Sequence, residues 1–172
     1  MQKQETYWWI IIGVERRMND IMKKAFKKAK DTMNKNYGGP FGAAVVSANG
    51  EILSVASNSV LKDHNPTAHG EINAIIKACK KINSEDLSGC TLYTTAYPCP
   101  MCLGAIVWAN IEKVYYGCTA EDAAEIGFRD DYIYDFIKGD MKDKTVMEIK
   151  QIDREECIKL FEEYKIKGKT IY

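Results

Sequence analysis

Two short motifs decide how this chain folds: TAHGE at residues 67–71 and PCPMC at residues 98–102. A residue that precedes proline is pushed out of the helical region, whereas proline itself is favoured at the first helical position. Cys99 is therefore expected at the start of a helix, with Cys102 on its first turn. His69, which comes soon after Pro66, is expected at the start of another helix. The chain thus brings one imidazole and two thiols to helix N-termini, where thiolates are favoured.

These three side chains suit a single zinc ion. Histidine nitrogen and cysteine sulfur are the usual zinc ligands, and three protein ligands leave the fourth position to water, as in catalytic sites. Zinc lowers the pKa of bound water to about 7, which makes hydroxide available at neutral pH. Glu71 lies two residues after His69, so it points elsewhere on its helix and need not bind the metal. We expect Glu71 to carry protons beside the bound water.

Around the motifs, hydrophobic periodicity predicts one domain of mixed sheet and helices. The dipeptide Asn49-Gly50 predicts a hairpin between two strands, at 42–47 and 52–56. A strand at 90–95, a helix at 100–110 and a strand at 113–117 predict a parallel crossover. The other predicted helices span residues 18–33, 68–81, 120–128, 131–137 and 154–164, and a last strand spans 146–152.

Composition favours a small ligand over a long polyanion. The chain has 172 residues, of which 24 are Lys or Arg and 24 are Asp or Glu, so its formal net charge is zero. A balanced chain has no global field that attracts nucleic acid. Five lysines between positions 23 and 30 line the polar face of the first predicted helix, and we expect this face to be solvated.

The six cysteines and the N-terminus bear on location. No secretion signal is evident, so the thiols are expected in a reducing cytoplasm and not in disulfides. The apolar run at 7–12 is far shorter than the roughly 20 residues that cross a bilayer. We expect residues 1–17 to be an N-terminal extension that need not be structured, followed by a single domain at 18–172.

Four stretches carry a family resemblance: GGPFGAAVV (38–46), NPTAHGEINAI (65–75), PCPMCLGAIVWA (98–109) and DAAEIGFRDDYIY (122–134). The pairing of H-x-E with P-C-x-x-C is the signature of zinc-dependent deaminases. Over residues 18–137 the chain resembles the cytidine-deaminase superfamily and, within it, the bacterial guanine deaminases. The resemblance implies an α/β fold, a three-layer α/β/α sandwich around a mixed five-stranded sheet. It also implies hydrolysis of guanine to xanthine and ammonia, a reaction of purine catabolism or salvage.

The resemblance further implies a homodimer and assigns roles to individual residues. The C-terminal segment, about 140–172, would be swapped between subunits to close the partner's active site. His69, Cys99 and Cys102 match the zinc ligands and Glu71 matches the proton shuttle. Four residues match family residues that contact the substrate: Asn58, Phe41, Trp108 and the terminal Tyr172. Asp130 matches a second catalytic carboxylate.

Structural alternatives stand beside these roles. Asn58 could cap a turn, Asp130 could cap the next helix, and Phe41 and Trp108 could simply pack in the core. A terminal residue such as Tyr172 is usually poorly ordered. Because Arg129 breaks the usual pattern, Asp131 is the other candidate for the second carboxylate.

Three other functions compete with guanine deamination. Deamination of adenosine in tRNA uses the same metal set and suits the lysine-rich helix, but it suits the zero net charge poorly. Cytosine deamination is suggested because Ala96-Tyr97 stands where guanine deaminases usually have Cys-Glu. A structural zinc module would need a fourth protein ligand, for which Cys90, Cys118 and His64 are available.

Overall fold

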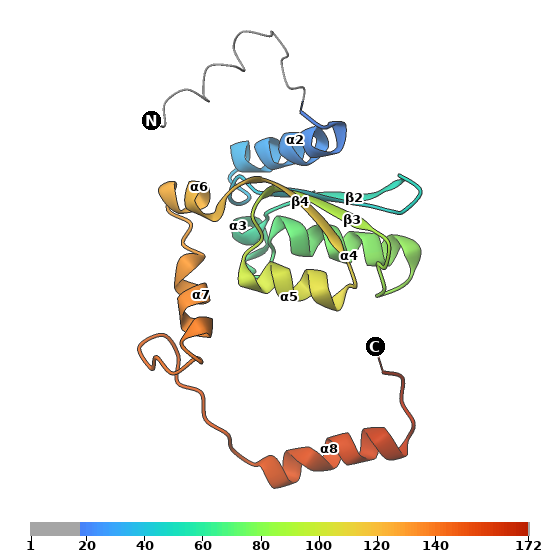
Figure 1. Cartoon of the computed structure of the whole chain (residues 1–172), viewed down its shortest axis with the longest axis vertical. Helices are drawn as coiled ribbons and strands as arrows, with labels where there is room; N and C mark the ends of the chain where they lie inside the picture. The colour runs from blue at the N-terminus through green and yellow to red at the C-terminus, as the bar shows by residue number, and fades with distance from the viewer. Residues whose placement is uncertain (1–17, 172) are drawn as a thin grey trace, which may run out of the picture.

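Four strands form one mixed sheet in the computed structural model, which describes residues 18–171 (Figure 1). The spatial order is β2 (Ile52–Ser57), β1 (Gly42–Val46), β3 (Thr91–Ala96) and β4 (Lys113–Cys118). β1 pairs antiparallel with both of its neighbours, and β3 pairs parallel with β4. The predicted hairpin and the parallel crossover are both confirmed.

The β1–β2 hairpin closes through Asn49-Gly50. The Gly50 N–H donates to the Ser47 carbonyl at 2.9 Å, and Gly50 has a φ of +86°, which side chains other than glycine rarely adopt. The strand register then runs from the Val46–Ile52 pair to the Gly42–Ser57 pair, with one irregularity between Val45 and Val46.

Helices cover both faces of the sheet (Figure 1). Helix α2 (Asp20–Asn34) lies on one face and begins at Asn19, whose side chain accepts from two backbone N–H groups of the first turn. Helices α4 (Gly70–Ile82) and α5 (Pro100–Trp108) lie on the other face. Apolar side chains between the layers form the core, among them Val45, Ile75, Leu87, Leu92 and Ile106.

The predicted five-stranded sheet is wrong for the described chain, which has four strands. Residues 146–152 alternate apolar and polar side chains, yet they form no strand, and Met147, Ile149 and Ile152 are exposed. A strand needs a neighbour for its backbone hydrogen bonds, and this segment lies away from the β4 edge (Figure 1).

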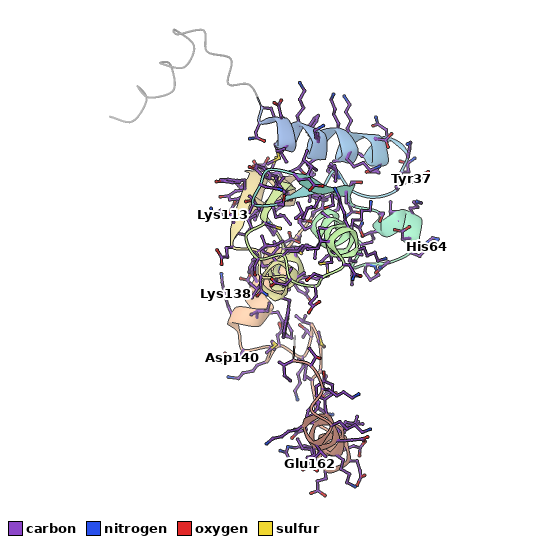
Figure 2. All side chains as sticks on the ribbon, turned by 90° about the vertical axis from the view of Figure 1, so that its right-hand side faces the viewer. Tyr37, His64, Lys113, Lys138, Asp140 and Glu162 are labelled. Carbon is purple, nitrogen blue, oxygen red and sulfur yellow. The ribbon has the colours of Figure 1, made fainter. Side chains whose placement is uncertain are left out.

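The C-terminal third extends away from the sheet. Helices α6 (Ala120–Glu125) and α7 (Asp131–Lys138) follow β4, and α8 (Arg154–Ile166) stands apart with no buried residue. Figure 2 shows the same separation from the side, with Glu162 on the detached helix. A further short helix, α3 (Val60–Asp63), was not predicted.

The described residues contain no helix long and apolar enough to cross a membrane. All six cysteines lie in this part of the chain, and none of them is in a disulfide. The predicted extension at residues 1–17 lies outside the described residues.

Candidate metal centre and active site

Two helix N-termini bring the predicted metal ligands together. His69 and Cys99 are the N-cap residues of α4 and α5, both in extended backbone conformation, and Pro100 opens α5 as its first helical residue. Each of the two cysteine Sγ atoms, of Cys99 and Cys102, lies 3.6 Å from His69 Nδ1. The three ligand atoms lie within 4.8 Å of one another, and both cysteines are buried.

This donor set fits zinc with an open position. Among residues 18–171 the group holds these three residues only, so Cys90, Cys118 and His64 supply no fourth ligand. His64 lies at the end of α3, on the outer surface of the molecule (Figure 2). A closed structural site would need four protein ligands, whereas three are typical of catalytic zinc.

The two thiols of the group differ in how strongly they hold a proton. The hydrogen bond from Cys102 and the neighbouring His69 ring lower the pKa of Cys99 to about 4. The same hydrogen bond, together with burial and the nearby Glu71, raises the pKa of Cys102. Because the thiolate is the ligand form, binding of a metal would release any proton that the two thiols still hold.

Glu71 is a buried carboxylate beside these ligands. Only 5% of its surface is exposed, and burial raises its pKa above the ordinary value. Its Oε1 accepts a hydrogen bond of 3.0 Å from the Thr94 hydroxyl, and its Oε2 lies 3.6 Å from Cys102 Sγ. A carboxyl with a raised pKa accepts a proton more readily than an ordinary carboxylate does, which suits general acid–base catalysis.

A cavity of about 330 Å³ opens beside His69, Glu71 and Cys99. Most of its wall is apolar, with a few polar groups, which is typical of a small-molecule site. The predicted residues Phe41, Asn58 and Asp130 line it as well. The remaining lining residues are Gly38, Gly39, Val60, Leu61, Pro66, Tyr97, Ala123 and Phe128.

Asn58 lines the cavity, and its side-chain oxygen is held by two backbone N–H groups. Its Oδ1 accepts from the backbone N–H groups of Gly39 and Val60 at 3.3 and 3.1 Å, and 4% of the residue is exposed. The side-chain NH₂ remains for a ligand, so this residue suits a ligand acceptor atom. Gly38 permits the arrangement, since a Cβ at this position would lie 2.1 Å from Asn58 Oδ1. Asn58 also caps the local turn, so both of its predicted roles are compatible.

Two aromatic rings form one wall of the cavity. Phe41 and Phe128 meet edge to face, with ring centroids 4.8 Å apart and an interplanar angle of 89°. Phe128 was not predicted, although it lies within the GFRDD segment that indicated Asp130. Tyr97 and Thr94 were also missed; both belong to the strand and loop just before the PCPMC motif.

Asp130 reaches the cavity from the N-cap position of α7. Partial burial and the nearby Cys99 raise its pKa. The Tyr134 hydroxyl, one helical turn further on, donates to the Pro98 carbonyl at 3.1 Å and ties α7 to the loop that carries Cys99. Asp131, the other candidate, is exposed and pairs with Arg129.

Trp108 does not lie at the cavity. Trp108 is the last residue of α5, at the opposite end of the helix from Cys99; it is 76% exposed and does not line the cavity. The predicted role of Tyr172 falls outside the described residues.

Comparisons with known proteins agree with this geometry. The family described as the cytidine and deoxycytidylate deaminase zinc-binding region matches residues 15–118. The chain is 44% identical to a guanine deaminase of Bacillus subtilis, over 73% of this chain and 80% of that protein. A tRNA-specific adenosine deaminase of Aquifex aeolicus is 45% identical, over 56% of this chain and 62% of that protein.

A solved structure extends the agreement to three dimensions. The X-ray structure of guanine deaminase from Bacillus subtilis has a TM-score of 0.77 at 40% identity, and the match covers 86% of this chain and 94% of that chain. The guanine deaminase matches thus continue beyond the zinc-binding region. The chain belongs to the zinc-dependent cytidine and deoxycytidylate deaminase family, on its guanine deaminase branch.

Proposed function

We propose that this protein is a hydrolase that converts guanine and water to xanthine and ammonia. The observation that carries the proposal is one cavity that joins the His69, Cys99 and Cys102 group and Glu71 to Asn58 and an aromatic wall. Zinc held by these three ligands would supply a Lewis acid that lowers the pKa of water toward 7.

The residues of the chain then bind the base and move the protons. Phe41 and Phe128 contact the planar ring, and the Asn58 NH₂ donates to an acceptor atom such as the guanine carbonyl oxygen. Glu71 takes a proton from the attacking water and passes it to the ring nitrogen next to the amino-bearing carbon. The C–O bond forms at this carbon.

In the second half of the reaction, the C–N bond to the amino group breaks. Glu71 receives the remaining hydroxyl proton and delivers it to the departing nitrogen, which leaves as ammonia. Asp130, which lines the same cavity, assists this transfer, and its raised pKa suits it to the role. Protons, atoms and electrons balance, and no oxidant or reductant is needed.

Guanine is favoured over a tRNA adenosine on two grounds. Over the same 73% of this chain, the identity is 44% to a guanine deaminase and 33% to a tRNA-specific adenosine deaminase. The lysine-rich surface of α2 lies on the opposite face of the sheet from α4 and α5, whose N-termini carry the site (Figure 1). A nucleic-acid backbone bound by those lysines would lie away from the cavity.

The decisive experiment offers each substrate separately to the zinc-loaded protein. Ammonia release is measured with guanine, cytosine and an anticodon stem-loop, with the Glu71→Gln variant as the blank. We expect ammonia from guanine only. Release from the stem-loop or from cytosine, without release from guanine, would replace guanine by that substrate, and release from none would contradict enzymatic deamination.

We also propose that the working unit is a homodimer in which a second copy covers β4 and the C-terminal segment. Val107 and Trp108 on α5 and Tyr115 and Tyr116 on β4, an edge strand of the sheet, are exposed large apolar side chains. The C-terminal segment carries exposed apolar side chains of its own, including Leu160, Phe161 and Ile166. Apolar surfaces of this kind are rarely left uncovered.

The location and domain proposals follow the same reasoning. Residues 18–172 form one deaminase unit, whose segment at about 140–172 packs on the partner and brings Tyr172 to its cavity. The thiols of the metal site function in a reducing compartment, so we place the protein in the cytoplasm.

A further inference from the structure

A buried hydroxyl lies directly beneath the candidate active site. In β3, residues 92, 94 and 96 point into the core, and Thr94 is 0% exposed. Thr94 pairs with Ala43 on one side and with Tyr116 on the other, so its backbone is fixed in the middle of the sheet. Leu92 and Ala96 are apolar, which makes Thr94 the polar exception on this face of the strand.

The hydroxyl of Thr94 contacts the carboxylate of Glu71. Thr94 Oγ1 donates to Glu71 Oε1 at 3.0 Å, between residues that are both buried. A hydroxyl can donate one hydrogen bond, and the Thr94 hydroxyl donates it to the Glu71 carboxylate. A hydrogen bond to a charged acceptor is among the stronger ones in a protein.

The two oxygens of Glu71 therefore have different surroundings. Oε1 faces the sheet and Thr94, whereas Oε2 lies 3.6 Å from Cys102 Sγ, on the side of the metal ligands. A Cys102 thiolate bound to a metal has no proton to donate, so Cys102 would then give Oε2 no hydrogen bond. Rotation of the carboxylate would exchange the two oxygens, and the Thr94 hydrogen bond opposes that rotation.

We propose that Thr94 is a positioning residue that anchors Oε1 of Glu71, so that Oε2 alone exchanges protons with water and substrate. The inference rests on the proposed function of Glu71 as proton carrier. Thr94 lines no part of the cavity and touches no substrate, so it acts only through Glu71.

Two substitutions separate this role from simple packing. Thr94→Val keeps the shape of the side chain and removes the hydroxyl, whereas Thr94→Ser keeps the hydroxyl and removes a methyl group. Ser54→Ala is the matched control, because Ser54 is also a buried hydroxyl and donates to the Ala74 carbonyl at 2.7 Å, away from the cavity.

Steady-state kinetics with guanine and zinc content by elemental analysis are measured for the three variants. In Thr94→Val we expect kcat to fall about 10- to 100-fold, the effect of one lost hydrogen bond to a charged group, with KM and zinc content unchanged. Thr94→Ser should restore kcat to within about threefold of the parent, and Ser54→Ala should leave it unchanged.

A second measurement is independent of turnover. Guanine binding to Glu71→Gln, measured by calorimetry, should be the same with and without Thr94→Val. An unchanged kcat in Thr94→Val, a failure of Thr94→Ser to restore it, or a weaker guanine affinity would overturn the inference. If the parent protein released no ammonia from guanine, the proposed function itself would be contradicted. If the parent protein is active and Thr94→Val has the same kcat, only the proposed role of Thr94 is contradicted.

Discussion

Glu71 combines burial with a polar neighbour on each carboxylate oxygen, which suits a proton carrier better than a structural charge. A buried carboxylate without a cationic partner costs stability and persists in folded proteins mainly where function requires it. Within the described chain, no ion pair involves Glu71.

The Glu71→Gln variant tests this role. Glutamine has nearly the same shape and can still accept from Thr94, but it cannot take a proton from water. We expect turnover of guanine to fall about 10²- to 10⁴-fold, with zinc content unchanged. Ammonia release and elemental analysis on one preparation check both parts. A variant that keeps more than a tenth of the parent activity would remove Glu71 from the mechanism.

Asn58 offers a second test at the scale of one residue. Asn58→Asp keeps an oxygen for the N–H groups of Gly39 and Val60 but removes the NH₂ that is proposed to donate to the base. We expect KM for guanine to rise about 10- to 100-fold, because one hydrogen bond to the base is lost. Thermal unfolding serves as the control, since the turn itself keeps its acceptor. An unchanged KM would show that Asn58 has only its capping role.

At the scale of the elements, the metal joins the N-termini of α4 and α5. Zinc that binds only the folded chain stabilises it, so chelation should lower the unfolding temperature by about 5–10 °C and abolish activity, and zinc should restore both. Differential scanning fluorimetry is the measurement. Cys157→Ser, at an exposed thiol outside the site, should behave like the parent, whereas Cys102→Ser should lose the response. A parent protein indifferent to chelation and to added zinc would contradict the assigned centre.

The same scale shows what sequence patterns could and could not predict. The β1–β2 hairpin and the β3–α5–β4 crossover follow from local signals, namely Asn49-Gly50 and Pro100, and both are present. The prediction of a strand at 146–152 was wrong. The alternation of apolar and polar residues indicates that one face is covered, but it does not indicate which part of the molecule covers it. The four-residue α3 is too short for any periodicity to show.

Prediction of the site followed the same division. His69, Cys99 and Cys102 could be found because each ligand lies at a helix start that proline or a nearby turn indicates. Phe128 and Thr94 meet Phe41 and Glu71 only after the chain has folded, across long sequence separations. Contacts of this kind leave no periodic signal, so they could not be found from the sequence alone.

At the scale of the whole molecule, α8 and the free edge of β4 are surfaces that one chain leaves open. Helix α8 has no buried residue, and its large apolar side chains Phe161 and Leu160 are 70% and 67% exposed. On the main body, Trp108 at the end of α5 and Tyr115 on β4 are 76% and 55% exposed. In a two-fold dimer, the α8 of each subunit would pack on the main body of the other subunit, so that both surfaces are covered in both subunits.

We therefore expect a dimer in solution, measured by size-exclusion chromatography with light scattering. Phe161→Ala should weaken the dimer and lower guanine turnover at low protein concentration, because truncation of a buried aromatic anchor is costly at an interface. Glu162→Ala, at the adjacent exposed position, is the matched control and should leave the mass and the activity unchanged. Zinc content should be the same in both variants, since the ligands lie on α4 and α5. If the parent protein is monomeric and fully active, the swapped segment is not needed to close the cavity. If Phe161→Ala alone loses activity as the protein concentration falls, dimer formation is linked to catalysis.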